Sequence, residues 1–456
     1  MTTTGYSLTD PATGPTPWPA PHATSAVQAT VAVPGSKSLT NRKLVLAAIA
    51  DGPSTLAAPL HSDDSARMIG ALRALGAEID EVPGTGAFGP DLHVTPPASF
   101  RGDVVIDCGQ AGTVMRFIAP LAGLATGDVT LTAHESALHR PMGEMIKALR
   151  DLGVDIDDGG HWALPFTVRG HGHIRGGEVT IDASRSSQFV SGLLLAAPRF
   201  DVGLHLIHSG ERLPSVPHID MTVETLARRG IHVEHPSPNE WVVPAGTPRG
   251  RDAAIEPDLS NAAPFLAAAL LTHGTVTVPA WPASSTQPGA LLPEILSLLG
   301  ARVSRRGGAL TVAGGAQIAG VDLDLTAASE LAPTLFALAA FADAPTVLHG
   351  IGHIRGHETD RIDALVGNLR ALGGDARELP DGIHITPAPL HGGLWRAHHD
   401  HRIATAGVLI GLRVPGVEVD DIGTTAKTMP EFPALWQGML GQGMLDPAPS
   451  GGASRG

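Results

Sequence analysis

One pattern recurs five times along the chain: a helical stretch of mixed polarity, a glycine and a short strand. The segments are ALRALGAEID, ALRDLGVDID, TLARRGIHVE, ILSLLGARVS and NLRALGGDAR. Their glycines are Gly76, Gly153, Gly230, Gly300 and Gly373, at steps of 77, 77, 70 and 73 residues. Glycine readily takes the left-handed conformation that ends many helices. Spacing this regular predicts repeated units of supersecondary structure rather than chance similarity in a chain rich in alanine and leucine.

A second series of short polar turns alternates with the first. It comprises DCGQAGTVMRF from Asp107, DASRSSQFVSG from Asp182, DLSNAAPFLAA from Asp258, DLTAASELAPT from Asp324 and HDHRIATAGVL from His399. Each turn precedes a helix of small apolar residues, and PGSKSLTNR, residues 34–42, is the sixth member. Each unit therefore holds two helices and several strands, roughly βαβαββ. We expect the units to pack into globules, with six positively polarised helix starts directed into one cleft.

The segment PGSKSLTNR is typical of an anion-binding helix start. A proline and a glycine interrupt the preceding strand, and the apolar run LVLAAIA follows at residues 44–50. The first N–H groups of a helix lack partners within it, and Lys37 and Arg42 add positive charge, so the turn suits a phosphate or carboxylate. It does not match the phosphate loop of nucleotide hydrolases, because Thr30 stands where that motif requires a glycine. An ordinary capped surface turn is the alternative interpretation.

The charge of the chain favours a local pocket for small anions. The formal net charge is −14, and the four lysines are Lys37, Lys43, Lys147 and Lys427. An acidic chain is a poor general binder of nucleic acid and of anionic membranes, so we expect neither as a partner. The cations that cluster in the motifs therefore indicate a site for a small molecule.

Other features of the composition limit cofactors and location. The single Cys108 excludes an intrachain disulfide and a multi-cysteine metal site, and the 22 histidines are scattered, so we expect no metal and no cofactor. We see no secretory leader, and the apolar run at 262–272 is too short to span a bilayer, so we expect a cytoplasmic protein. Residues 1–25, rich in proline, are predicted to be a disordered arm, and residues 446–456 a flexible tail.

Seven motifs follow one another along the chain. They are PGSKSLTNR, QAGTVMR from Gln110, HRP from His139, SSQF from Ser186, ETDR from Glu358, DHR from Asp400 and AKTMPEF from Ala426. Each alone is weak, but together they make about residues 29–440 resemble the 5-enolpyruvylshikimate-3-phosphate synthase family. The resemblance implies an α/β (α+β) enolpyruvyl transferase fold, in which two domains of three βαβαββ repeats enclose a substrate cleft. It places the domains at residues 26–35 plus 256–445 and at 36–255, and it suggests a monomer.

The resemblance also implies a reaction and its binding residues. The enolpyruvyl group of phosphoenolpyruvate would move to the 5-hydroxyl of shikimate-3-phosphate, with release of phosphate, in chorismate and aromatic amino acid biosynthesis. Such substrates bring two phosphates and two carboxylates, which arginine binds well. The residues expected to bind shikimate-3-phosphate are Lys37, Ser38, Arg42, Ser186, Ser187, Gln188, Ser215, Glu330 and His357. Those expected to bind phosphoenolpyruvate are Lys37, Gln110, Gly112, Arg140, Gln188, Arg361, Arg402 and Lys427.

The residues that the resemblance makes catalytic are Lys37, Glu330, Glu358, His401 and Lys427. Glu330 matches the base that takes the 5-hydroxyl proton, although a residue favoured at a helix start by the dipole is the alternative. Glu358 matches the acid that protonates the methylene carbon, and the two roles reverse during elimination. Lys37, His401 and Lys427 are the candidates for protonating the leaving phosphate, and the choice among them stays open. His401 alternatively only fixes the geometry of Arg402.

The chain departs from the common family pattern at five positions. Gln110 replaces a frequent asparagine, Phe117 a proline, His218 a tyrosine, Glu330 an aspartate and His357 a lysine. Glutamate keeps the base but lengthens it by one methylene, and a histidine makes one substrate contact weaker and pH-dependent. The family's small residue beside the phosphoenolpyruvate site is retained as a glycine at position 112. Glyphosate is therefore expected to inhibit, and a change of this glycine to alanine to reduce the inhibition.

Two alternative functions stay open. The sister enolpyruvyl transferase that acts on UDP-N-acetylglucosamine uses a cysteine on a mobile loop, whereas Cys108 lies in a strand-to-helix turn. A non-catalytic, anion-binding paralogue is expected to lose the proton-transfer residues, yet Glu330, Glu358 and Lys427 are present.

Overall fold

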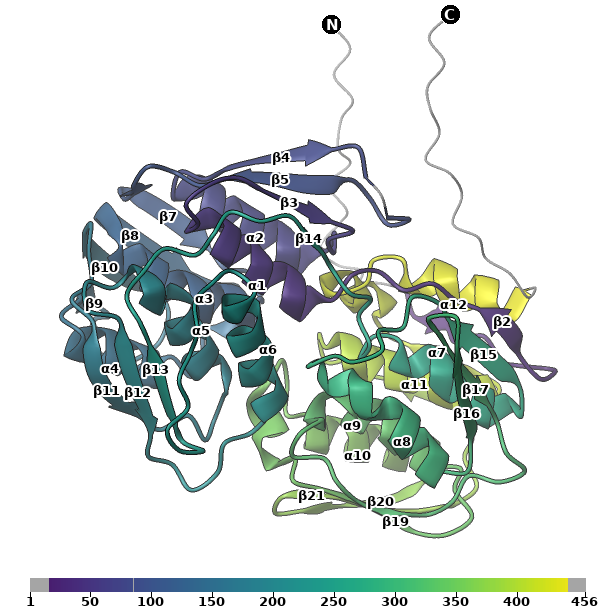
Figure 1. Cartoon of the computed structure of the whole chain (residues 1–456). Coiled ribbons are helices and arrows are strands. Elements are labelled where there is room, and N and C mark those ends of the chain that lie inside the picture. Colours follow the sequence, from purple (N-terminus) through teal and green to yellow (C-terminus); the bar gives the residue numbers. More distant parts are fainter. Residues whose placement is uncertain (1–15, 85, 442–456) are drawn as a thin grey trace, which may run out of the picture.

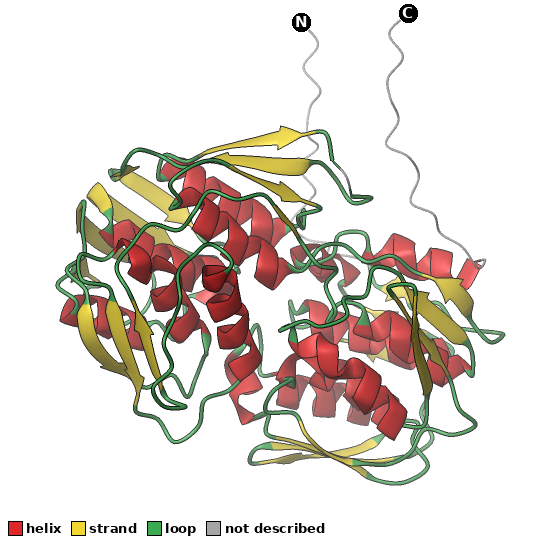
Figure 2. Ribbon diagram, in the orientation of Figure 1, coloured by secondary structure: helices red, strands yellow, loops and turns green. Residues whose placement is uncertain are grey.

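The computed structural model describes residues 16–84 and 86–441 of the chain. Figure 1 shows two halves, the first mainly from the purple-to-teal part of the sequence and the second mainly from the green-to-yellow part. Helices gather inside each half, and strands lie on the outside (Figure 2). Each half has its own hydrophobic core. One core cluster runs from Leu44 to Val243, and the other combines Ala20 to Val33 with Leu259 to Met439.

The helices and strands keep the alternation that the repeats predict. The α-helices are α1 Lys37–Ala48, α2 Asp63–Ala74, α3 Gly112–Gly123, α4 Gly143–Asp151, α5 Gln188–Ala196, α6 Val216–Ala227, α7 Ala263–Thr272, α8 Leu292–Leu298, α9 Ala332–Ala339, α10 Arg361–Ala371, α11 His401–Arg413 and α12 Phe432–Gly441. The 3-10 helices are η1 Glu135–Ala137, η2 Ala197–Arg199, η3 Pro288–Leu291, η4 Ser329–Leu331, η5 Gly352–Gly356 and η6 Ile422–Lys427. The strands up to residue 254 are β1 Trp18–Pro19, β2 Gln28–Thr30, β3 Ser54–Ala57, β4 Glu78–Val82, β5 Asp91–Thr95, β6 Phe100–Arg101, β7 Val104–Asp107, β8 Ala125–Thr132, β9 Asp155–Asp157, β10 Phe166–His171, β11 Gly177–Ile181, β12 Leu204–His208, β13 Glu240–Val243 and β14 Ala253–Ala254. The later strands are β15 Thr275–Val278, β16 Arg302–Arg306, β17 Ala309–Ala313, β18 Asp322–Asp324, β19 Thr346–His349, β20 Asp375–Leu379, β21 Gly382–Thr386, β22 Gly393–Trp395 and β23 Val417–Val419.

The described strands form six sheets, one for each predicted unit, and four of these units show the full βαβαββ order. Two units follow the chain directly as βαβαββ, one from β7 to β10 with α3 and α4, and one from β18 to β21 with α9 and α10. Two others borrow their first strand from a distant segment. β14 pairs with β3 in parallel, and β2 pairs with β15 in parallel. The remaining two sheets, β11–β12–β13 and β1–β23–β22, have three strands each.

The glycines of the repeat end their helices as predicted. Gly76, Gly153, Gly230, Gly300 and Gly373 have φ between 84° and 108°. This region is open to glycine and strained for residues with a Cβ atom. The first helix of each unit lies in the interior instead, and in α7 every residue from Ala263 to Leu271 is buried. A helix that is apolar all round belongs inside a domain.

The chain crosses between the halves twice, at adjoining places. Gly35 forms an isolated antiparallel bridge with Pro257, and the Ser36 N–H donates to the Glu256 carbonyl at 2.8 Å. The two core clusters divide the chain in the same region. The domain boundaries 26–35 plus 256–445 and 36–255 stay predictions, and residues 442–445 lie outside the described residues. No helix among the described residues has the length and apolar character needed to cross a bilayer.

The prediction of a disordered arm over residues 1–25 is wrong for its last part. Trp18–Pro19 is strand β1, which pairs antiparallel with β23. The Ala20 N–H donates to the Val417 carbonyl at 3.0 Å, and the Ala20 side chain is buried. Proline tolerates an edge strand, so the composition that predicted disorder is compatible with this pairing. Residues 1–15 and the predicted tail at 446–456 lie outside the described residues.

Candidate active site

A cavity between the halves collects residues from all six polar turns. Its lining includes Ser36, Lys37 and Ser38 at α1, Gly112 and Thr113 at α3, Ser186, Ser187 and Gln188 at α5, Asp258, Ser260 and Asn261 before α7, Ser329 and Glu330 before α9, and His401 and Arg402 at α11. Six helix starts therefore meet at one cleft, as the repeat predicted. The unpaired N–H groups and dipoles of helix starts favour bound anions.

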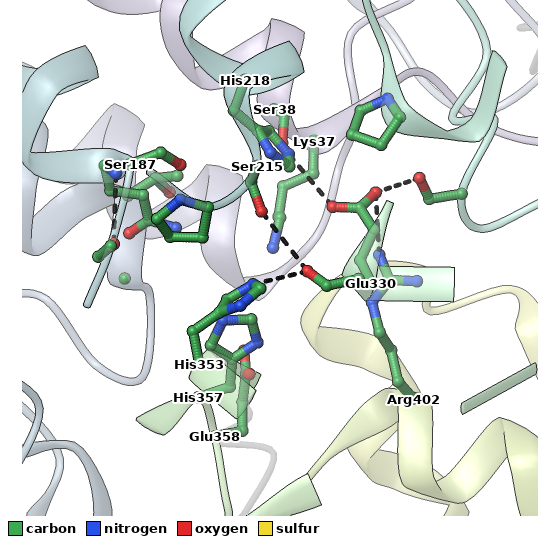
Figure 3. A pocket seen from close by; sticks show the side chains of 18 of the residues that line it. Lys37, Ser38, Ser187, Ser215, His218, Glu330, His353, His357, Glu358 and Arg402 are labelled. Atoms are coloured by element: carbon green, nitrogen blue, oxygen red, sulfur yellow. Dashed lines mark hydrogen bonds and ion pairs between the residues drawn. The ribbon is translucent and has the colours of Figure 1, made fainter. Parts of the chain in front are cut away.

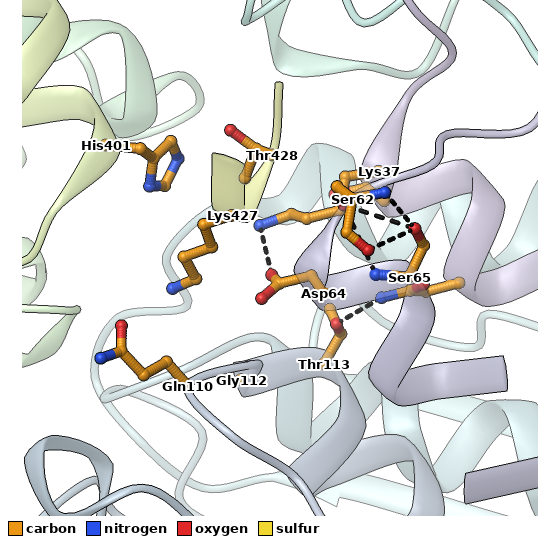
Figure 4. A network of polar contacts seen from close by, with 12 residues as sticks. Lys37, Ser62, Asp64, Ser65, Gln110, Gly112, Thr113, His401, Lys427 and Thr428 are labelled. Carbon is orange, nitrogen blue, oxygen red and sulfur yellow. Dashed lines mark hydrogen bonds and ion pairs between the residues drawn. The ribbon is translucent and has the colours of Figure 1, made fainter. Parts of the chain in front are cut away.

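Lys37 is fixed at the start of α1 by two acids. Ser36 caps the helix by accepting from the Leu39 N–H, and the Lys37 N–H donates to Asp258 Oδ2 at 3.1 Å. Lys37 Nζ lies 3.3 Å from Asp64 Oδ2 on α2 (Figure 4). Lys37 lines the cavity, and its role as a substrate contact stays a prediction.

The structure does not bring Arg42 to the cavity. Its guanidinium is buried, and Nε donates to Thr222 Oγ1 at 2.8 Å while Nη2 donates to the His218 carbonyl at 2.8 Å and to Ser191 Oγ at 3.2 Å. Nη1 donates to the Ser38 carbonyl at 3.0 Å. Burial lowers the pKa of Arg42 to about 9. Arg42 therefore ties α1 to α5 and α6 and supports the cavity wall from behind.

A wall of hydroxyl and amide groups lies at the starts of α5 and α6. Ser186, Ser187 and Gln188 line the cavity together, and Ser186 Oγ accepts from the Gln188 N–H at 3.2 Å. Ser215 precedes α6 in the left-handed conformation, and its N–H donates to the Thr326 carbonyl of the other half at 3.1 Å. Arg185, which the motif analysis gave no role, lines the same cavity. The arrangement suits a phosphate.

Glu358 is surrounded by three cations. Lys427 Nζ donates to Glu358 Oε1, Arg361 Nη2 donates to Oε2 at 2.9 Å, and Arg140 Nη2 lies 3.8 Å from Oε1. Arg361 is itself held by Asp400, which accepts from its Nε at 2.7 Å. Burial alone would raise the pKa of Glu358, but the charges of Lys427, Arg361 and Arg140 hold it well below its usual range. An anionic ligand that enters the cavity would compete with Glu358 for these three cations.

Gln110 and Gly112 shape this cation cluster. The Gln110 carbonyl accepts from Arg140 Nη1 at 2.9 Å, so the backbone of the turn orients the arginine. Gly112 faces the arginine closely, since a Cβ atom there would lie 3.4 Å from Arg140 Nη1. Gln110 and Lys427 line a second cavity and not the first one, and Figure 4 shows them together with His401 and Lys37.

Glu330 receives contacts at both carboxylate oxygens. Ser260 Oγ donates to Oε1, Arg402 Nη2 lies 3.7 Å from Oε1, and His218 Nε2 lies 3.2 Å from Oε2 (Figure 3). Burial alone would raise the pKa of Glu330, but the charge and hydrogen bond of His218 and the charge of Arg402 outweigh it and lower the pKa. Glu330 is therefore an ionised carboxylate in this arrangement and is available as a proton acceptor.

Histidines complete the cavity. His357 Nδ1 accepts from Arg361 Nη1 at 3.0 Å, and burial followed by the charge of Arg361 lowers the pKa of His357 well below its usual range. His357, for which the sequence predicted a pH-dependent substrate contact, is therefore a neutral imidazole near pH 7. His401 is buried, and neither of its ring nitrogens has a hydrogen-bond partner among the described residues. Its Nδ1 lies 3.7 Å from Asp400 Oδ1, which leaves Nε2 free to meet a ligand. His353 Nε2, in contrast, pairs with Ser329 Oγ at 2.8 Å.

Several residues of the site were missed from the sequence. They are Asp64, Arg116, Arg185, Asp258, Ser260, His353 and Asp400, and His218 was noted only as a departure from the family pattern. Ser260 and Asp258 lie in the polar turn DLSNAAP, the one turn of the six to which no site residue was assigned. This missing assignment in an otherwise complete series could have indicated that Asp258 and Ser260 belong to the site. The partners Asp64 and Asp400 depend on packing between distant segments.

Comparisons with known proteins identify relatives of the whole chain. The sequence model of a family described as EPSP synthase (3-phosphoshikimate 1-carboxyvinyltransferase) matches residues 21–436. A 3-phosphoshikimate 1-carboxyvinyltransferase of Kocuria rhizophila is 54% identical over 430 residues, which cover 93% of this chain and 96% of the relative. The EPSP synthase of Acinetobacter baumannii has a similar structure, with a TM-score of 0.74, 25% identity and coverage of 94% of this chain and 98% of that one. The enolpyruvyl transferase NikO of Streptomyces tendae shares the fold, with a TM-score of 0.74, 19% identity and coverage of 94% and 98%.

Proposed function

The chain belongs to the EPSP synthase (3-phosphoshikimate 1-carboxyvinyltransferase) family, and from this premise we propose how its cavity carries out the family's reaction. The enzyme transfers the enolpyruvyl group of phosphoenolpyruvate to the 5-hydroxyl of shikimate-3-phosphate and releases phosphate. The observation that carries the assignment of the site is the meeting of six helix starts at one cavity. There Lys427, Arg140 and Arg361 surround Glu358, and Arg402 lies beside Glu330.

The charges of the cavity suit both substrates. Phosphoenolpyruvate would bind Arg140, Arg361, Arg402 and Lys427, next to Gly112, where the absence of a side chain leaves room. Shikimate-3-phosphate would place its phosphate at the Ser186, Ser187 and Ser215 hydroxyls and its ring between Lys37, Gln188, Glu330 and His357. Arg42 would act on this second substrate through Ser38 and the helix start, because its own guanidinium is fully engaged in the protein.

Addition is the first chemical step in this proposal. Glu330 takes the proton of the 5-hydroxyl, whose oxygen forms a bond to C2 of phosphoenolpyruvate, while Glu358 delivers a proton to the methylene carbon and makes it a methyl group. Glu358 needs a raised pKa for this role. Bound phosphate and carboxylate groups compete for Lys427, Arg361 and Arg140, so substrate binding would weaken the charges that now hold its pKa low.

Elimination reverses the proton transfers. The Glu358 carboxylate removes a proton from the new methyl group, the C2–O bond to phosphate breaks, and phosphate leaves with its electron pair. Lys37, His401 and Lys427 are placed to donate a proton or hydrogen bond to it. His401 fits this role because its Nε2 has no hydrogen-bond partner among the described residues.

The alternative functions receive less support. Cys108 is buried, and burial followed by the charge of Asp107 raises the pKa of its thiol to about 12, so it is a poor counterpart to the loop cysteine of the sister transferase. A binding-only protein has no need of two carboxylates set among cations. A cytoplasmic location and a monomeric state stay predictions, and sedimentation of the purified protein tests the second.

Phosphate release from phosphoenolpyruvate by the purified protein, in excess EDTA, tests the proposed reaction. We expect release with shikimate-3-phosphate and none with UDP-N-acetylglucosamine. Lys37→Met should abolish it by removing a fixed cation. Lys147→Met is the matched control, because Lys147 is half exposed and pairs only with Asp151 and the Thr180 carbonyl among the described residues.

Each outcome of this assay has a distinct meaning. Release only with the sugar nucleotide would assign the chain to the sister reaction. No release with either acceptor, from folded protein, would favour anion binding without catalysis. Full activity of Lys37→Met would remove the assigned role of the α1 start while leaving the overall reaction intact.

A further inference from the structure

Glu330 has contacts from both halves of the molecule. Ser260 and Arg402 belong to the half that carries Glu330, and both reach Oε1. His218 lies on α6 of the opposite half, and its Nε2 approaches Oε2 at 3.2 Å. Figure 3 shows the imidazole of His218 directed at the carboxylate from the opposite side to Arg402. The second oxygen of Glu330 is thus contacted across the cleft.

The start of α6 docks beside Glu330 through its backbone. The Ser215 N–H donates to the Thr326 carbonyl at 3.1 Å, and Ser215 Oγ lies 3.5 Å from Ser329 Oγ. The His218 N–H donates in turn to the Ser215 carbonyl at 2.9 Å. These bonds link the first turn of α6 to the segment that ends at Glu330. They bring the imidazole and the carboxylate together when the halves meet.

We propose that His218 is a positioning residue that fixes the Glu330 carboxylate from across the cleft. A glutamate side chain has several rotatable bonds, and Ser260 holds only one of its oxygens. His218 Nε2–H supplies the second anchor, so the carboxylate is held in one orientation by contacts from both halves of the molecule. A catalytic side chain that is held at both oxygens by its surroundings is oriented in advance for proton transfer. This inference rests on the proposed function of Glu330.

The role of the His218 side chain is separable from that of its backbone. The His218 carbonyl accepts from Arg42 Nη2 and from Thr222 Oγ1, at 2.8 and 3.0 Å. Substitution of the imidazole leaves these bonds in place. A variant at this position is therefore expected to fold and to keep α6 tied to α1.

The charges that face the pair are few and known. Glu330 is faced by His218 from α6 and by Arg402 from α11, with Asp258 before α7, Arg361 on α10 and Arg42 on α1 at longer range. His353 on η5 is also near His218, and burial, followed by the charges of Arg361 and His218, lowers the pKa of His353. Loss of the His218 contact removes the strongest favourable influence on the ionised form of Glu330. The pKa of Glu330 should then rise.

Two substitutions of similar polarity distinguish loss of the hydrogen bond to Glu330 from loss of side-chain volume at position 218. His218→Gln places an amide N–H near the position of Nε2, whereas His218→Asn places it near Nδ1, too short to reach Glu330. We expect His218→Asn to lower kcat about tenfold to a hundredfold, with KM for shikimate-3-phosphate changed less than about threefold. His218→Gln should stay within about threefold of the wild type. In His218→Asn the acid limb of the kcat/KM profile should move to higher pH.

A double-mutant cycle tests the contact itself. Glu330→Asp draws the carboxylate back by one methylene and lowers activity on its own. In that background His218→Asn should change kcat by less than about twofold, because the contact is already lost. Thermal unfolding midpoints of all variants serve as the check on folding, and the cycle can be repeated with Ser260→Ala, for which an effect on kcat is also expected.

The outcomes separate this proposal from the proposed function. Equal activity of His218→Asn and His218→Gln would overturn the positioning role and leave the reaction unchanged. The same holds if His218→Asn lowers kcat by the same factor in the wild type and in the Glu330→Asp background. An inactive wild-type protein would instead overturn the proposed function. If His218→Asn fails to fold, the double variant that combines His218→Gln with Ser260→Ala takes its place. An unchanged kcat and an unchanged pH profile in that double variant would contradict the proposal that both oxygens of Glu330 are anchored for catalysis.

Discussion

Among single residues, Gly112 shows how little space the cation cluster leaves. A Cβ atom there would lie 3.0 Å from Arg116 Nη1, 3.1 Å from Gln188 Oε1 and 3.4 Å from Arg140 Nη1. Gly112→Ala should displace these groups and raise KM for phosphoenolpyruvate about tenfold. Inhibition by glyphosate should weaken by a larger factor. Inhibition curves for both proteins measure this, with Gly70→Ala as control because a Cβ atom at Gly70 meets nothing within 4 Å. Equal inhibition of the wild type and Gly112→Ala would contradict the prediction.

The position of a residue at the cavity was predictable where a motif places that residue at a helix start. Lys37, Ser187 and Glu330 lie at the cavity because each occupies the polar turn of its unit. Arg42 was assigned to substrate for the same reason, yet it lies one turn into α1 and points into the core. A motif alone does not tell a side chain that meets the ligand from one that holds the helix. His218 reaches Glu330 only through packing of the two halves, which no local pattern records.

Among the elements, strand β1 carries a test of the corrected N-terminal arm. β1 pairs with β23, and Ala20 packs so closely on α11 that a Cβ atom at Gly411 would lie 2.3 Å from Ala20 Cβ. A chain that lacks residues 1–24 should lose this pairing and the burial of Ala20. We expect its thermal midpoint to fall by several degrees relative to a chain that lacks only residues 1–15, since about 1–3 kcal/mol of packing and hydrogen bonding is removed. Equal midpoints for the two truncations would show that β1 adds no stability.

The elements differ in how far the sequence predicts them. Helices that end in Gly76, Gly153 or Gly300 combine a helical pattern with a capping glycine, and all of them form. The strands β1, β2 and β14 have two or three residues and no period to read. Their place is set by the sheet edge that they complete in a distant unit. The six-fold architecture was therefore visible in the sequence, whereas the exchange of edge strands between units depends on tertiary structure.

Over the whole molecule, the cleft gathers buried and half-buried histidines that stay neutral near pH 7. Burial and then the charge of Arg402 lower the pKa of His401 well below its usual range, and burial followed by the charge of Arg361 does the same for His357. Burial lowers the pKa of His353 to about 4. The unfolded chain takes up protons on these groups as the pH falls through about 6.5, while the folded protein does not. Their contribution to stability is therefore complete above about pH 6.5 and declines below it.

This difference predicts a measurable change in acid sensitivity when His401 is replaced. A histidine that stays neutral only in the folded state removes about 1.4 kcal/mol of stability per pH unit below about pH 6.5, or about 2 kcal/mol at pH 5. His401→Gln should therefore lose about 2 kcal/mol less unfolding free energy than the wild type between about pH 7.5 and pH 5, measured by urea titration. His232→Gln, at an exposed histidine, is the matched control. Glu330 and Glu358, whose pKa values are lowered, lose their contribution only below about pH 4.5 and so lie outside this window. An equal loss in the wild type and His401→Gln would mean that the folded protein takes up a proton at His401, which would make this residue a proton donor already in the free enzyme.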